Sequence, residues 1–182
     1  MARVPYLEVA DLPAEQQDLL KRPIALFKAL VNSPNAARAF SGLGHYIRYG
    51  SKLDPRLREL AILQVGWLAR SPYEWSHHVK IGHDFGVTDD DIRALIDDTA
   101  GRPVQLDALA RSVLRAAREM TQDGAMSEAS FATLQQALGN EQAVDLTLTI
   151  AFYNAVVRVL ATLQIDVEYD YMPYLRQFPL PG

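Results

Sequence analysis

The sequence predicts an all-α fold, and three observations support this prediction. Apolar residues recur at helical spacing through most of the chain, and no stretch shows the sustained alternation of a β-strand. Helix-start signals such as Asp54-Pro55 and Ser71-Pro72 divide the sequence at short intervals. The connections between them are short, which favours antiparallel neighbouring helices. The length of 182 residues is typical of one domain, residues 1–182.

Each helix is predicted from its start signal and from the apolar spacing that follows. Asp11, Pro23 and Ser33-Pro34 precede the first three segments, and Thr88 with Asp91 reads as a capping box further along the chain. The segment 55–70 is apolar on nearly all sides, which indicates a central buried helix. The predicted helices span residues 12–21, 23–32, 35–49, 55–70, 72–85, 88–98, 105–122, 127–138 and 141–163.

The most apolar stretch, Val144–Leu163, is expected to be a buried helix of a bundle. It contains Asp145, Asn154 and Arg158, which are costly in a bilayer and easily accommodated between packed helices. The N-terminus lacks the apolar core of a secretory signal. We therefore expect a cytoplasmic protein with no membrane partner.

The two ends of the chain, at about 1–10 and 166–182, are expected to be extended arms. Both are rich in proline and aromatic residues and lack helical periodicity. Exposed aromatics at the density of the second arm would form an adhesive patch unless they were covered. That arm either packs on a neighbouring subunit or wraps around its own domain.

Composition excludes several classes of function. The chain has no cysteine, which excludes disulfides, thiolate metal sites and every thiol-based mechanism. The formal net charge is −4, and no basic run marks a nucleic-acid surface. No phosphate-binding glycine loop, dinucleotide fingerprint or nucleophilic serine elbow is present.

The densest set of reactive side chains lies at Ser71–His78, near the start of one predicted helix. At 100° per residue, Glu74 and His78 share a narrow stripe with Ile81 and Phe85, so this stripe is expected to face inward. Glu74 would then orient the His78 imidazole. Two structural alternatives remain: Glu74 as the second member of a capping box with Ser71, and His78 as a buried, hydrogen-bonded histidine.

Glu59 is a further candidate residue, and a metal site is a further alternative for Glu74 and His78. Glu59 shares a stripe with Gly66, which would permit an inward carboxylate; alternatively, it is a first-turn acid favoured by the helix dipole. Glu74 and His78 could form two parts of a metal site, but no third ligand stands at a characteristic spacing. We therefore expect no metal and no cofactor.

Within Tyr49–Ile96, the sequence resembles the carboxymuconolactone decarboxylase family, which includes the alkyl hydroperoxidase D branch. The motifs that carry the resemblance are Leu-Asp-Pro-Arg-Leu-Arg-Glu-Leu, Ser-Pro-Tyr-Glu-Trp-x-His-His and Gly-Val-Thr-Asp-Asp-Asp-Ile. From Phe152 onward, the chain resembles the last core helix of the family. The resemblance implies an alkyl hydroperoxidase D-like helical bundle around a central hairpin. It also implies a homo-oligomer, commonly a trimer or hexamer, with a dimer possible.

The peroxidase branch of that family carries Glu, then Cys-x-x-Cys-x-x-x-His. Glu59 and His78 match the outer positions of this pattern, but Ser71 and Glu74 stand where the cysteines would be. A serine hydroxyl cannot cycle through sulfenic acid and disulfide, so thiol peroxidase activity should be absent. The decarboxylase-like pattern Tyr-Glu-Trp-x-x-His is present from Tyr73 to His78.

The resemblance therefore implies a cofactor-free lyase or isomerase acting on a small carboxylated unsaturated or lactone substrate. Glu74 and His78 would be the catalytic pair: His78 would transfer the proton, and Glu74 would orient the His78 imidazole. The candidate substrate-binding residues are Tyr73, Trp75, Glu59, Arg58 and Arg70, with Arg48 and Arg56 as further arginines beside the hairpin. The alternative is a non-catalytic oligomer of the same fold that binds a small molecule or a partner protein.

Overall fold

The computed structural model describes residues 2–181, and no strand is present over that range. The prediction of an all-α fold is confirmed. In chain order the helices are η1 (Val9–Asp11), η2 (Ala14–Leu20), α1 (Ala25–Leu30), α2 (Pro34–His45), η3 (Tyr46–Gly50), α3 (Pro55–Leu68), α4 (Pro72–Asp84), α5 (Asp89–Thr99), α6 (Ala108–Gln122), α7 (Glu128–Leu163), η4 (Tyr169–Tyr171) and α8 (Met172–Gln177).

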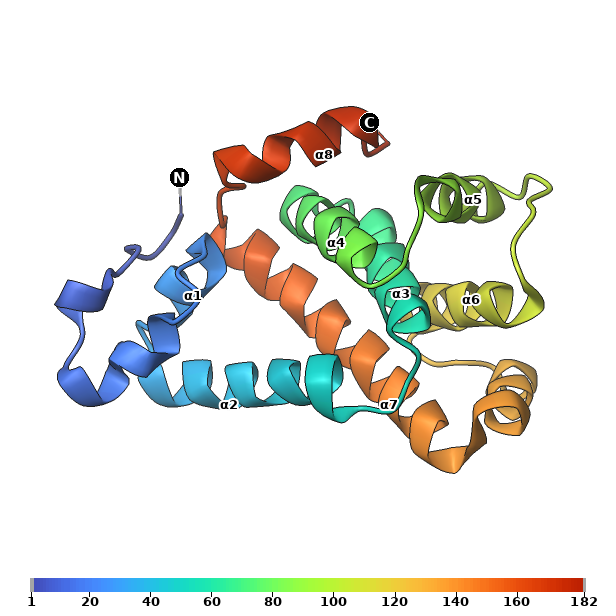
Figure 1. The fold of residues 1–182 in the computed structure, drawn as a ribbon, viewed down its shortest axis with the longest axis horizontal. Coiled ribbons are helices and arrows are strands. Elements are labelled where there is room, and N and C mark those ends of the chain that lie inside the picture. The colour runs from blue at the N-terminus through green and yellow to red at the C-terminus, as the bar shows by residue number, and fades with distance from the viewer. Residues whose placement is uncertain (1, 182) are drawn as a thin grey trace.

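Helices α3 and α4 form the central hairpin of the fold (Figure 1). α3 contacts α4, α5, α6 and α7, and every side chain from Leu57 to Gly66 is buried, as expected for a helix that is apolar nearly all round. The two predicted start signals are confirmed. The Asp54 side chain accepts a hydrogen bond from the Leu57 amide, and the Ser71 side chain accepts one from the Glu74 amide.

The turn between α3 and α4 reverses the chain within three residues. Arg70 adopts a left-handed conformation with φ 48°, and the Ser71 amide donates to the Gly66 carbonyl at 3.0 Å. A Cβ added at Gly66 would lie 3.4 Å from the Trp75 amide nitrogen, so glycine allows the two helices to approach closely. Side chains of α3 therefore reach directly into the layer formed by α4.

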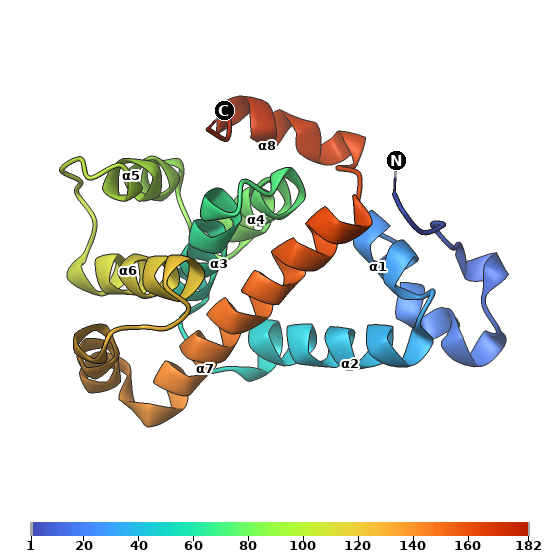
Figure 2. The same cartoon turned by 180° about the vertical axis from the view of Figure 1, so that it is seen from behind.

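Helix α7 runs diagonally past the hairpin and packs against α3 and α6 (Figure 2). Its one non-helical residue is Gly139, with φ 75°, which separates the two helices that the sequence predicts. By length and composition α7 could span a membrane. Nevertheless Leu146, Ile150 and Val157 are buried in the main hydrophobic core, as the prediction of a buried helix requires.

The N-terminal helices form a smaller core of their own, made of Leu12, Leu19, Leu20, Val31 and Ala37. The segment predicted as a helix at 12–21 is instead the 3₁₀ helix η2, which follows Pro13. α2 continues directly into a π-helical turn, η3. Both ends of this turn are held by Asp145 of α7, whose carboxylate accepts hydrogen bonds from Tyr46 Oη at 2.8 Å and Ser51 Oγ at 2.6 Å.

The C-terminal segment departs from the prediction of an extended arm. Tyr169–Gln177 is helical, because Pro173 in the first turn of α8 is compatible with helical φ and needs no donor there. Figure 1 shows α8 crossing over α4, which it contacts. The Trp75 indole N–H donates to the Phe178 carbonyl at 2.7 Å. The segment thus packs on its own chain.

Candidate functional site

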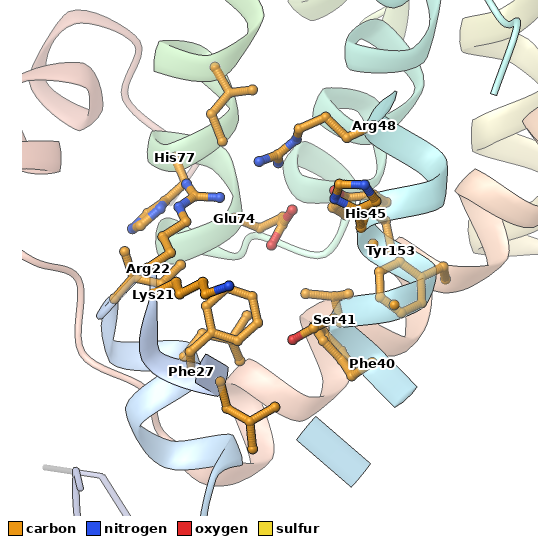
Figure 3. A pocket seen from close by; sticks show the side chains of 18 of the residues that line it. Lys21, Arg22, Phe27, Phe40, Ser41, His45, Arg48, Glu74, His77 and Tyr153 are labelled. Atoms are coloured by element: carbon orange, nitrogen blue, oxygen red, sulfur yellow. The ribbon is translucent and has the colours of Figure 1, made fainter. Parts of the chain in front are cut away.

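A cavity of about 460 Å³ lies between the N-terminal helices and the face of α4 that meets α7. Its apolar lining includes Leu26, Phe27, Phe40 and Phe152, and its ionisable side chains come from η2, α2, η3, α4, α7 and the residues before α1. Figure 3 shows the Glu74 carboxyl pointing into this space, with Arg22 and His77 on one side and Arg48 and His45 on the other. The volume is in the range of small-molecule sites.

Glu59, His78 and Glu74 form a line that leads from the core to the cavity. His78 Nδ1 lies 2.7 Å from Glu59 Oε2 in a hydrogen bond, and His78 Nε2 lies 3.1 Å from Glu74 Oε1. The second contact is close, but it is not a hydrogen bond in this geometry. Glu74 Oε1 therefore has no hydrogen-bond partner within residues 2–181. The orienting acid of His78 is therefore Glu59, and Glu74 is the carboxyl that faces the cavity.

Glu59 is held as an anion by its surroundings. The Arg58 guanidinium lies 3.0 Å from Glu59 Oε1, and Arg58 also donates to the Arg48 carbonyl and covers the Phe85 ring at 4.5 Å. Burial would raise the pKa of Glu59, but the His78 imidazole and the Arg58 and Arg48 guanidiniums outweigh burial and lower it. The structure thus shows an inward Glu59 carboxylate bonded to His78, and the alternative of a first-turn acid is wrong.

The protonation states of His78 and Glu74 follow from burial. Burial lowers the pKa of His78 despite the neighbouring Glu59, so the neutral imidazole donates its Nδ1 proton and presents Nε2 as an acceptor. Burial, and then the charge of Glu59, raise the pKa of Glu74 to about 8. At neutral pH, Glu74 is therefore a carboxylic acid beside the free lone pair of His78.

Two guanidiniums face this carboxyl from different elements. Arg48 and Arg22 both favour the ionised form of Glu74, and both line the cavity. Neither forms an ion pair with a carboxylate of the described residues. The π-helical turn η3 supplies Arg48, and such turns widen the helix locally and often occur at functional sites. The cavity therefore offers two guanidiniums that have no carboxylate in ion-pair contact within residues 2–181, although Glu59 acts on Arg48 at longer range.

A second pair of a histidine and a carboxylate, His77 and Glu168, lies beside the same cavity and was not predicted from the sequence. The His77 ring is stacked between Tyr73, at a centroid distance of 4.0 Å, and Tyr171, at 3.5 Å. Its Nε2 lies 2.8 Å from Glu168 Oε2, and Glu168 Oε1 accepts bonds from the Ala25 amide at 2.7 Å and from Tyr73 Oη at 3.2 Å. Glu168 thus joins α4, α1 and the C-terminal segment.

The predicted substrate-binding residues are distributed unevenly around this site. Tyr73 lines the cavity, whereas Glu59 and Arg58 lie behind His78 and support it. Trp75 is fully buried and anchors the C-terminal segment, and Arg70 is exposed at the hairpin turn, away from the main cavity.

The capping alternative for Glu74 holds only in part. The Ser71 hydroxyl accepts from the Glu74 amide at 3.4 Å, but the Glu74 carboxyl does not return to the Ser71 amide, which is bonded to Gly66. Among residues 2–181, no group of three or more His, Asp or Glu side chains could hold a metal ion. The reactive groups that line the cavity are carboxyl, imidazole, phenol, guanidinium, the Lys21 amine and the Ser41 hydroxyl.

The comparisons with known proteins give a family match for part of the chain and solved structures of similar fold. Residues 34–119 match the Carboxymuconolactone decarboxylase family, whereas no curated protein sequence matches the chain significantly. A peroxidase-related protein from Ralstonia eutropha with an alkylhydroperoxidase AhpD core is 18% identical, with a TM-score of 0.80 over 96% of this chain and 95% of that chain. A peroxidase-related protein from Silicibacter sp. is 21% identical, with a TM-score of 0.75 over 93% and 92%.

The debrominase Bmp8, in a cysteine-to-alanine variant bound to 2,3,4-tribromopyrrole, shares the same architecture. It is 19% identical to this chain, with a TM-score of 0.79, and the alignment covers 97% of each. The TM-scores show that these proteins share the fold, and at identities this low the likeness shows the fold alone. The family match covers the hairpin that carries Glu59, Glu74 and His78. Residues 34–119 therefore match the carboxymuconolactone decarboxylase family, and the chain has the alkyl hydroperoxidase D-like helical fold and contains no cysteine.

Proposed function

We propose that the chain is a cofactor-free lyase or isomerase for a small carboxylated unsaturated or lactone substrate, with proton transfer through the Glu74–His78 pair. One observation carries the proposal: the Glu74 carboxyl lies on a cavity wall, 3.1 Å from the Nε2 of a histidine whose Nδ1 is fixed by Glu59. This arrangement supplies an acid, a base and an orienting group in one line.

The lining of the cavity favours an anionic substrate. Arg48 and Arg22 present guanidiniums without carboxylate partners in the described chain, and such groups bind carboxylates in two-point geometry. Phe27, Phe40 and Phe152 provide apolar surface for a planar ring. A fold neighbour, Bmp8, binds 2,3,4-tribromopyrrole, which is consistent with a small unsaturated ring as ligand.

The chemistry requires only these groups. In a decarboxylation, the bond from carbon to CO₂ breaks and its electron pair is delocalised into the unsaturated system, where the arginines stabilise the negative charge. Glu74 then donates its proton to carbon, and His78 and solvent restore it. In an isomerisation, Glu74 would first pass its own proton to His78 Nε2 and then, as a carboxylate, remove a proton from carbon. That proton would return at another carbon, and His78 would give its proton back to Glu74.

The test measures deuterium incorporation and CO₂ release from a panel of small unsaturated carboxylates and lactones in D₂O. We expect Glu74→Gln and His78→Gln to reduce turnover at least about 100-fold, the usual contribution of acid–base catalysis. Exposed residues provide matched controls, with His83→Gln on the same helix and Glu128→Gln at the start of α7. Undiminished turnover in both site variants would refute the proposed role.

A second candidate function is non-catalytic binding of a small molecule in the same cavity. The observation that favours it is the low exposure of the pair, 4% for His78 and 3% for Glu74. A protein of this kind would retain ligand affinity in a Glu74→Gln and His78→Asn double variant. An enzyme would lose turnover in that variant.

We further propose that the protein acts as a homo-oligomer. Tyr46, Tyr49 and Val144 are large apolar side chains that remain exposed, by 41%, 66% and 60%. Covering such residues is a common driving force for self-association. Light scattering coupled to size-exclusion chromatography would give the stoichiometry, and a monomer at micromolar concentration would contradict the proposal.

A further inference from the structure

Binding an anionic ligand beside Glu74 is electrostatically unfavourable unless the Glu74 carboxyl carries a proton. Glu59 on α3 is ionised and lies one histidine away, and Glu74 itself is fully buried with one oxygen unpartnered. The positively charged side chains that act on Glu74 are Arg48 on η3 and Arg22 before α1. Lys21 also lines the cavity, and so does Arg38, which pairs with Asp18. A ligand carboxylate would be the third carboxyl group facing two guanidiniums.

We propose that this cavity binds a carboxylate together with a proton: the ligand lies between Arg48 and Arg22 and accepts a hydrogen bond from Glu74, which stays a carboxylic acid in the complex. The inference concerns the same cavity as the proposed function and deepens it by fixing the protonation state in which an anion binds. It does not require turnover.

The physical reason is the repulsion between carboxylates that share a site. Two carboxylates in contact share one proton, because the second ionisation would place like charges a few ångströms apart in a low-dielectric environment. In the free protein, burial and Glu59 already raise the pKa of Glu74 to about 8. A bound anion raises it further, so the complex holds a proton that the free protein releases in mild alkali.

The other titratable groups on the cavity wall are less suited to this role. His78 donates its Nδ1 proton to Glu59, and burial, Arg48 and His77 disfavour a second proton on its ring. Burial, followed by the charges of Glu74 and Glu59, raises the pKa of Tyr153, so its phenol stays neutral throughout. His77 is bonded to Glu168, and burial lowers its pKa as well. His45, Lys21, Tyr49 and Tyr73 also line the cavity, and the Glu74→Gln variant distinguishes proton uptake at Glu74 from uptake at any of them.

Linkage gives the size of the effect. If the bound complex keeps Glu74 protonated, proton uptake per ligand equals the ionised fraction of Glu74 in the free protein. With the pKa of Glu74 at about 8, uptake is roughly 0.03 at pH 6.5, 0.5 at pH 8 and 0.9 at pH 9. Above pH 8.5, the dissociation constant then rises about tenfold per pH unit.

The experiment uses 2-furoate, a planar unsaturated ring with one carboxylate and no reaction open to it here. Isothermal titration calorimetry at pH 6.5, 8 and 9, in pairs of buffers with different ionisation enthalpies, measures the protons taken up. We expect the number of protons that the wild type takes up per furoate to rise from roughly 0.03 at pH 6.5 to about 0.9 at pH 9. Glu74→Gln should still bind furoate, through its amide N–H, with uptake near zero at every pH and an affinity that no longer falls above pH 8.5.

Glu128→Gln is the control, since its exposed carboxyl lies outside the cavity lining, and its uptake should match the wild type. Three outcomes would overturn the inference: no furoate binding at pH 6.5, uptake near zero at pH 9 in the wild type, or unchanged uptake in Glu74→Gln. The proposed function can fail separately. Proton-coupled furoate binding without turnover of any substrate refutes only the enzyme, and Glu74-dependent turnover without uptake refutes only this coupling.

Discussion

The buried Glu74 carboxyl should make the protein less stable as the pH rises, and replacing it with glutamine should remove this effect. Glu74 is 3% exposed and its Oε1 has no hydrogen-bond partner in the described chain. Its pKa is about 8, compared with an ordinary value of 4.5. Ionising it in the folded state is therefore unfavourable, whereas the unfolded chain ionises it freely.

The magnitude follows from the two pKa values. Below pH 4.5 the carboxyl is protonated in both states, and the full stability is present. Between pH 4.5 and about 8, the folded protein keeps a proton that the unfolded chain has released, so stability falls by about 1.4 kcal/mol per pH unit. The accumulated loss between pH 5 and pH 8.5 is about 3–5 kcal/mol.

The assay is urea unfolding of the wild type and Glu74→Gln at both pH values. Glutamine cannot ionise, so the variant should be close to the wild type at pH 5 and more stable by several kcal/mol at pH 8.5. Subtracting the wild-type curve from the variant curve cancels every other titrating group. Equal differences at the two pH values would show that Glu74 does not titrate in this range and would refute the assigned protonation state.

Three further predictions concern residues around the cavity. Glu168→Gln should cost about 1–3 kcal/mol of unfolding free energy at pH 7, because the charged acceptor for the His77 ring is lost; a urea midpoint equal to the wild type would contradict this. Arg70→Gly should raise stability by up to about 1 kcal/mol and leave furoate affinity unchanged, since φ is 48° there; weaker binding would instead place Arg70 in the site. Trp75→Phe should lower stability by about 2–4 kcal/mol in urea, because the Phe178 carbonyl loses its donor and a gap remains; a loss below about 0.5 kcal/mol would count against this anchor.

Local signals were sufficient to predict most of the helical framework. The Asp54 and Ser71 caps, the Thr88–Asp91 capping box and the apolar runs each depend on residues within a few positions of one another. The C-terminal helix was missed because α8 has six residues, too few to show a helical period. Its place over α4 depends on a bond between Trp75 and Phe178, which no local pattern encodes.

The candidate site was predicted in part. Helical periodicity correctly placed Glu74 and His78 on one inward stripe, since both belong to the same helix. It could not show that Glu59, fifteen residues earlier than Glu74, is the acid that orients His78. That contact depends on the close approach of α3 and α4 at Gly66.

The amino-acid sequence was enough to predict a helical chain without thiol chemistry, with an acid and a histidine one turn apart near the start of a helix. These properties depend on composition and on spacing within single helices, which a linear sequence states directly. Three further features required the folded chain: which carboxyl faces the cavity, which of its arginines lack a carboxylate partner among the described residues, and the contacts of Glu168 with α4 and α1. Those outcomes depend on distances between residues far apart in the chain, and such distances are set by packing.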